Sequence, residues 1–107
     1  MKTCKQKEIF SKDDLVYRAS YQWIPVEEKN HQFKGDPNST KFNKYDGYQM
    51  LYIVNKILDH CSVKTTKLGK YIEVLIYIQL PPDINNQRQV YFWSLNKLRK
   101  EADYLVN

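Results

Sequence analysis

Residues 91–105 carry apolar side chains at alternating spacings of four and three, namely Tyr91, Leu95, Leu98, Ala102 and Leu105. At about 100° per residue, these side chains fall within one narrow stripe of an α-helix. The pattern therefore predicts an amphipathic helix that begins near Asn86. Gln89 lies three residues further on, where its side chain can complete a reciprocal N-terminal cap.

A second helix is predicted over residues 46–61. The carboxylate of Asp46 can accept the unpaired amide hydrogens of a first turn, and Gln49 follows three residues later, as in a capping box. One face of this helix is apolar without interruption and consists of Met50, Leu51, Val54, Ile57, Leu58 and Cys61. We expect this face to be core. The outer side carries Tyr45, Tyr48, Tyr52, Lys56 and Asp59.

Residues 66–80 match two templates. A strand is indicated by the alternating positions Ile72, Val74, Ile76, Ile78 and Leu80. A helix is indicated by Leu68, Ile72, Leu75 and Ile76. Either element would be apolar on most sides, and therefore mostly buried. We favour the helix because the stretch is long for one strand and because Pro81 and Pro82 supply a stop.

The N-terminal part of the chain has a different composition. Residues 1–14 are rich in lysine and poor in apolar groups, which predicts a flexible basic tail. From residue 17 onward the side chains alternate in polarity, which predicts a half-buried strand with one face formed by Tyr17, Ala19, Tyr21 and Trp23. Residues 25–44 are polar and rich in turn-forming residues, so we expect a long loop. The aromatic face of the strand needs a partner, and the tyrosines beside residues 46–61 are the expected one.

The length of 107 residues and the hydrophobic content of 42% fit one hydrophobic core. We therefore expect a flexible basic tail over residues 1–14 and a single globular domain over residues 15–107. The expected fold is mainly α, or α+β at the margin. It is a three-helix bundle with a helix-turn-helix-like hairpin, with the N-terminal strand and long loop packed on it.

The resemblance to a helix-turn-helix lies in the spacing between the first two helices. Such a motif needs a small residue at the turn and apolar residues at fixed distances after it, positions that are occupied by Ser62, Val63, Leu68 and Tyr71. The exposed groups that would meet DNA are then Lys64, Thr65, Lys67 and Lys70. The bulky Leu58 stands where the first helix of such a motif has a small residue. An ordinary helical hairpin with a solvated lysine turn is the alternative.

The outer face of the last helix supplies a second group of candidates, Trp93, Lys97, Lys100 and Tyr104. Aromatic and cationic side chains together can stack on bases and neutralise phosphates. The same residue types also form protein-binding hot spots. A third interpretation is structural, because the strand and loop of the N-terminal half can cover this face and bury Trp93 as core.

No catalytic or cofactor motif emerges from the remaining residues. Asp59, His60 and Cys61 are consecutive, so on a helix they point about 100° apart and cannot form a nucleophile and base pair. The spacing of the histidines and cysteines matches no zinc pattern, and the glycines are too far apart for a phosphate loop. We therefore expect no enzyme activity, no cofactor and no metal. Without a secretory signal or a membrane-spanning apolar run, we expect a cytoplasmic protein.

The net charge of +5 favours an anionic partner slightly. The functional expectation is a small non-enzymatic binding module, with nucleic acid as the favoured ligand of the basic and aromatic helical surface. The alternative is a protein-interaction or homodimer-forming module, in which the apolar stripe of the last helix meets a second copy. No small-molecule substrate is evident.

Overall fold

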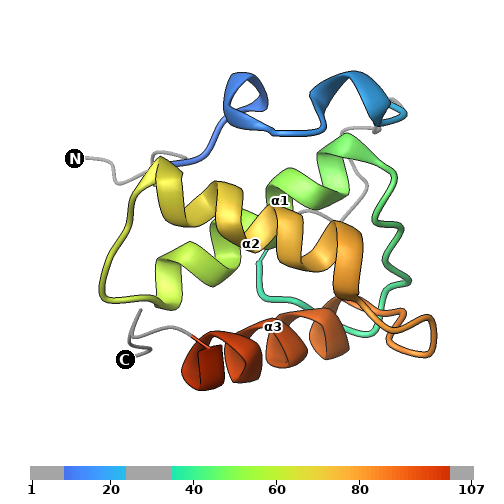
Figure 1. Ribbon diagram of the computed structural model, residues 1–107. Coiled ribbons are helices and arrows are strands. Elements are labelled where there is room, and N and C mark those ends of the chain that lie inside the picture. The colour runs from blue at the N-terminus through green and yellow to red at the C-terminus, as the bar shows by residue number, and fades with distance from the viewer. Residues whose placement is uncertain (1–8, 24–34, 102–107) are drawn as a thin grey trace.

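The computed structural model describes residues 9–23 and 35–101. Across these ranges the chain forms two short 3-10 turns and three α-helices, η1 (Lys12–Asp14), η2 (Arg18–Ser20), α1 (Gly47–His60), α2 (Thr66–Gln79) and α3 (Gln87–Glu101). The two turns lie over one side of the α1–α2 pair, and α3 lies on the other side (Figure 1). The predicted mainly helical fold with a three-helix bundle is confirmed. No helix in the described ranges has the length and apolar character needed to cross a membrane.

Helix α1 begins as its sequence predicts. The Oδ1 atom of Asp46 accepts a hydrogen bond from the Tyr48 amide at 3.0 Å. Gln49 contributes differently from a capping box, because its Nε2 donates to Asp46 Oδ2 at 3.1 Å and its Oε1 accepts from the Asn43 amide at 2.8 Å. The cap therefore extends to the chain before the helix, and it fixes residues 43–46 against the first turn.

Residues 66–79 are helical, which resolves the ambiguity between strand and helix. The Oγ1 atom of Thr65 accepts from the Leu68 amide at 3.1 Å and caps the helix. The helix ends at Gln79, just before the two prolines. Its apolar side chains are buried on several sides because α1, α3 and the N-terminal segment all pack on it, and this explains why its sequence lacks a clear amphipathic pattern.

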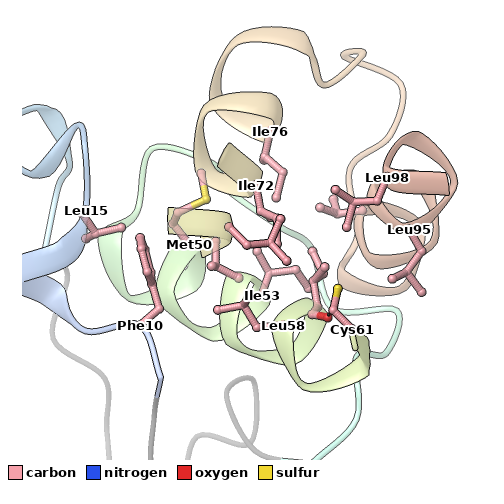
Figure 2. Packing of buried hydrophobic residues seen from close by; sticks show 14 of the residues in the cluster. Phe10, Leu15, Met50, Ile53, Leu58, Cys61, Ile72, Ile76, Leu95 and Leu98 are labelled. Atoms are coloured by element: carbon pink, nitrogen blue, oxygen red, sulfur yellow. Dashed lines mark hydrogen bonds between the residues drawn. The ribbon is translucent and has the colours of Figure 1, made fainter. Parts of the chain in front are cut away.

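The core lies where the three helices meet. Figure 2 shows Met50, Ile53 and Leu58 of α1 facing Ile72 and Ile76 of α2, with Leu95 and Leu98 of α3 beside Cys61. The predicted buried face of α1 is confirmed except at Leu51, which is half-buried, and it also includes Ile53. The predicted stripe of α3 is confirmed at Leu95 and Leu98, whereas Ala102 and Leu105 lie outside the described residues.

The predicted strand over residues 17–23 is wrong. This part of the chain contains the 3-10 turn η2 and one isolated bridge, in which the Gln22 amide donates to Tyr45 O at 2.8 Å and Gln22 O accepts from the Gly47 amide at 2.9 Å. No strand lies beside it within the described ranges, so its backbone has no sheet to join. The alternating aromatic residues instead pack on helices.

Residues 9–14 belong to the expected flexible tail over residues 1–14, but they pack on the helices. Phe10 is fully buried, and its ring sits against Gly69 of α2. Asn55 of α1 holds the backbone of Phe10 from both sides, because its Oδ1 accepts from the Phe10 amide at 3.0 Å and its Nδ2 donates to Phe10 O at 2.8 Å. Packing of the domain therefore begins before residue 15. Residues 1–8 lie outside the described ranges.

The second half of the predicted loop is attached to the beginning of α3. Thr40 O accepts from the Gln87 amide and Asn38 O accepts from the Arg88 amide, each at 2.9 Å. Asn86 caps the same turn through its Oδ1, which accepts from the Gln89 amide at 2.9 Å. The loop thus supplies acceptors that a helix N-terminus lacks, and the predicted beginning near Asn86 is confirmed. Residues 24–34 lie outside the described ranges.

Candidate nucleic-acid interface

Five exposed cations lie at the end of the bundle where α1 ends, α2 begins and α3 ends. We call this group the cationic end, and it consists of Lys64, Lys67, Lys70, Arg99 and Lys100. The α1–α2 connection and the last turn of α3 lie at the same end in Figure 1. Figure 2 agrees, since Cys61 at the end of α1 lies beside Leu95 and Leu98. The tertiary fold therefore brings together cations from two separate parts of the sequence.

Two of these lysines are held in place by backbone carbonyls. Lys64 Nζ donates to Asp59 O at 3.1 Å and to Cys61 O at 2.5 Å, which closes the C-terminus of α1. Lys70 Nζ donates to Asp14 O at 2.5 Å. A carbonyl orients an ammonium group without neutralising its charge, so these bonds fix the positions of both lysines at the surface.

The cationic end is not neutralised by the carboxylates of the described residues. None of its five members lies within 4.0 Å of a described carboxylate, and the ion pair found among the described residues, Arg18 with Asp13 at 3.1 Å, lies elsewhere. The carboxylate of Asp14 faces Ser11, whose backbone and side-chain hydrogen bonds lower the pKa of Asp14, and the charge of Lys70 lowers it further. Apart from the partial compensation of Lys70 by Asp14, the charge of this end is available to a ligand.

The structure gives Thr65 and α2 roles that differ from those in a DNA-reading hairpin. Thr65 caps α2 through its hydroxyl. The N-terminal segment covers α2 near Gly69 and Glu73, while α1 and α3 pack on its other sides. Only the first turns of α2 present cations, at Lys67 and Lys70, so the helix has no long free face of the kind that enters a major groove.

Trp93 is half-buried and packs against the core from the outside. The Nζ atom of Lys97 lies 5.8 Å from the centre of its ring, which is within the range of a cation–π contact. Lys100 is exposed one turn further on, and Tyr104 lies outside the described residues. Of the predicted group on α3, the structure therefore describes Trp93, Lys97 and Lys100. The indole of Trp93 also packs against the core.

Glu73, a carboxylate on α2, is fully buried, which was not expected from the sequence. Its Oε1 accepts from the Val16 amide at 2.6 Å, and its Oε2 accepts from the Tyr17 amide at 3.0 Å and from the Tyr21 hydroxyl at 2.6 Å. Burial, followed by this hydrogen bond, strongly raises the pKa of Tyr21. Glu73 thereby attaches the N-terminal segment to α2. The available signal was a carboxylate placed between Ile72 and Val74, within the apolar part of the helix.

The N-terminal aromatic side chains pack on α1, as expected, and they also pack on α2. Trp23 contacts Tyr48 edge-to-face at 5.0 Å between ring centres, and Lys12 Nζ lies 4.4 Å from the Trp23 ring. The unexpected partner is Tyr77 of α2, which stacks on Tyr17 at 4.1 Å and meets Tyr21 and Tyr45 edge-to-face, both at 5.7 Å. Tyr52 of α1 instead donates to Gly35 O at 2.8 Å.

The side chains of His60 and Cys61 contact different partners in the structure. His60 Nδ1 lies 3.4 Å from the Tyr91 hydroxyl, whereas the Cys61 thiol is buried and donates to Ile57 O at 3.2 Å. Burial raises the pKa of Cys61, so the reactive thiolate is disfavoured. In the parts of the chain that the structure describes, no three His, Cys, Asp or Glu side chains are grouped in a way that holds a metal ion.

Comparison with known proteins assigns neither a family nor a function to this chain. No protein-family model matches the chain, and neither a curated protein nor a solved structure is significantly similar to it. Any functional assignment for this chain therefore rests on its own residues and geometry.

Proposed function

We propose that this protein is a small non-enzymatic nucleic-acid-binding module whose cationic end contacts the phosphate backbone. The observation that carries this proposal is the presence of five exposed cations at one end of the bundle, none of which forms an ion pair with a described carboxylate. Phosphate contacts by lysine and arginine supply most of the affinity in non-specific nucleic-acid binding. The net charge of +5 has the same sign. The buried free thiol of Cys61 fits the reducing cytoplasm, which we propose as its compartment.

The geometry of α2 favours backbone contacts over base reading at this end. A recognition helix needs a free face that enters the major groove, whereas α2 is covered on several sides. Lys67, Lys70 and Lys100 can reach phosphates without such insertion. The cationic end therefore contributes affinity with little dependence on base sequence.

The alternative of a homodimer through the last helix has less support. Its expected interface includes Leu95 and Leu98, but these side chains are only 4% and 0% exposed because they pack against α1 and α2 within the same chain. A second copy cannot use the same side chains without unfolding the bundle. A protein ligand therefore needs another surface.

A fluorescence anisotropy titration with a labelled single-stranded oligonucleotide at low salt tests the proposal. Lys67→Glu with Lys100→Glu should weaken binding by about ten-fold or more, because it reverses two phosphate contacts. The matched control is Lys41→Glu with Arg88→Glu, which makes the same change in net charge at exposed positions outside the cationic end. Equal weakening by both pairs, or no binding by the wild-type protein, would overturn the proposal.

A further inference from the structure

A cleft of about 350 Å³ opens between the chain before α1 and the connection from α2 to α3. We call it the Tyr45 cleft. Phe42, Pro81 and Pro82 give it apolar walls, and Asn43, Lys44 and Asn85 bring polar groups to it. An apolar pocket with a few polar groups is the usual form of a ligand site. It lies apart from the cationic end, at the end of α2 rather than at its beginning (Figure 1).

Tyr45 has the geometry of a stacking platform. The residue is 50% exposed, although its ring contacts Tyr77 edge-to-face at 5.7 Å between ring centres. Its backbone is fixed at both ends, because its amide donates to Asn43 Oδ1 at 2.9 Å and its carbonyl accepts from the Gln22 amide at 2.8 Å. A ring that is held in place and still half open can receive a base with little loss of its own freedom.

Lys44 places a positively charged group over one face of this ring, so a base can stack only on the face that Lys44 does not cover. Its Nζ donates to Tyr77 O at 2.9 Å and lies 5.5 Å from the centre of the Tyr45 ring. An ammonium group has three hydrogens to donate, so two remain after this bond. No described carboxylate lies within ion-pair distance of it. The lysine is therefore oriented for an anionic group of a ligand that occupies the cleft.

The two asparagines supply hydrogen-bonding groups suited to a base edge. Asn43 uses its Oδ1 for the Tyr45 amide, which leaves its Nδ2 hydrogens for another acceptor. The exposed Asn85 uses its backbone in hydrogen bonds with Phe42 and Gln89, and no side-chain bond of Asn85 occurs among the described residues. Side-chain amides match the paired donors and acceptors of nucleobases.

We infer that the Tyr45 cleft binds an unpaired base, with its phosphate, of a single-stranded nucleic acid. The inference rests on the proposed function for the kind of ligand, and it adds the strandedness and a second contact site. A duplex keeps its bases stacked inside, so only an unpaired nucleotide can place a base on Tyr45. Lys44 then binds the phosphate, and the amides of Asn43 and Asn85 contact the base edge.

The first test is an NMR titration of the isotope-labelled protein with adenosine 5′-monophosphate and, separately, with inorganic phosphate. The nucleotide should shift the amides of Asn43, Lys44, Tyr45 and Asn85 in a saturable way, whereas phosphate alone should not. Tyr45→Ala should abolish these shifts, and Tyr45→Phe should retain them because the ring remains. The matched control is Phe92→Ala, which removes an aromatic side chain of similar exposure, 55%, outside the cleft.

Lys44→Gln keeps the inference testable even where Tyr45→Ala fails to fold. This variant should lower the affinity for adenosine 5′-monophosphate to the level of adenosine, whose affinity should not change. With a single-stranded oligonucleotide, Tyr45→Ala should weaken binding by roughly 5- to 150-fold, the loss of one stacked base. Binding of a blunt duplex should be unaffected by the same substitution.

The outcomes separate this inference from the proposed function. If the oligonucleotide shifts only amides at the cationic end and Tyr45→Ala binds it as tightly as wild type, the inference is overturned while the proposed function stands. If the nucleotide saturates the cleft but no oligonucleotide binds at low salt, the proposed function fails and the inference fails with it, because the cleft then binds free nucleotides and not a nucleic acid. Shifts in the cleft with an acidic proline-rich peptide but none with the nucleotide would overturn the inference in favour of a protein ligand.

Discussion

The substitution Gly69→Ala tests how the N-terminal segment is attached to the bundle. A Cβ atom at Gly69 would lie 2.4 Å from Cδ1, 2.8 Å from Cε1 and 3.0 Å from Cγ of Phe10. The ring cannot withdraw easily, because Asn55 holds the Phe10 amide and carbonyl and because the side chain is fully buried. The substitution therefore forces the ring or the helix to move.

The expected magnitude follows from two opposing terms. Overpacking of a core costs about 1–3 kcal/mol, and the close contacts with Phe10 place this site near the upper end. Alanine in a helix interior is about 1 kcal/mol more favourable than glycine. The net effect of Gly69→Ala on the free energy of unfolding should be a loss of about 2 kcal/mol, measured by urea denaturation.

The sign should reverse when the ring is absent. In a Phe10→Ala background the new Cβ meets no ring, so Gly69→Ala should raise the free energy of unfolding by about 1 kcal/mol. The double-mutant cycle should then show a coupling of about 3 kcal/mol between residues 10 and 69. Equal effects of Gly69→Ala in both backgrounds would refute the packing of Phe10 described here.

Three further predictions concern buried or half-buried polar groups. Glu73→Gln leaves one fewer acceptor for the Val16, Tyr17 and Tyr21 donors, so the free energy of unfolding should fall by about 2 kcal/mol, and an unchanged urea midpoint would contradict the attachment. Burial raises the pKa of Tyr52 to about 12, so its contribution to stability is present below pH 10 and is lost as the pH rises towards 12. Tyr52→Phe should reduce this loss in urea titrations at pH 9 to 12, and an equal loss in both proteins would argue against the shift. The Cys61 thiol should react with a thiol reagent at pH 8 only after unfolding, and rapid reaction of the native protein would contradict its burial.

The helices were predictable where their signals are local. Asp46 marks the beginning of α1, Asn86 marks the beginning of α3, and the apolar stripes of both helices face the core. Residues 66–79 were ambiguous because a helix packed on several sides has apolar residues at most positions, which removes the periodicity that separates a helix from a strand.

The N-terminal segment was mispredicted because its contacts are distant in sequence. Alternating aromatic residues from Tyr17 to Trp23 have the spacing of a strand, but their partners are Tyr48 and Tyr77 on helices. Phe10 belongs to the core only because Gly69 leaves room for its ring. The packing of this segment on the tyrosines of α1 was expected, but no pattern within residues 9–23 indicates the contact with Tyr77 or the burial of Phe10.

In the candidate site too, features that are local in sequence were predictable and features that depend on the tertiary fold were not. The individual lysines were identifiable as exposed cations, whereas their gathering at one end of the bundle depends on how α3 crosses α1 and α2. Thr65 proved to be a helix cap. The Tyr45 cleft could not be predicted, because its walls come from residues 42–45 and 80–85, which only the tertiary fold brings together.

The salt dependence of binding tests most directly the claim that the cationic end holds a phosphate backbone. Contact of all five cations with a single strand predicts a slope of about −3.5 for log Kobs against log[salt], from about −0.7 per neutralised phosphate. The Lys67→Glu and Lys100→Glu variant removes two contacts, so its slope should be shallower by about 1.4. A wild-type slope near zero, or the same slope for the wild type and the variant, would contradict the claim.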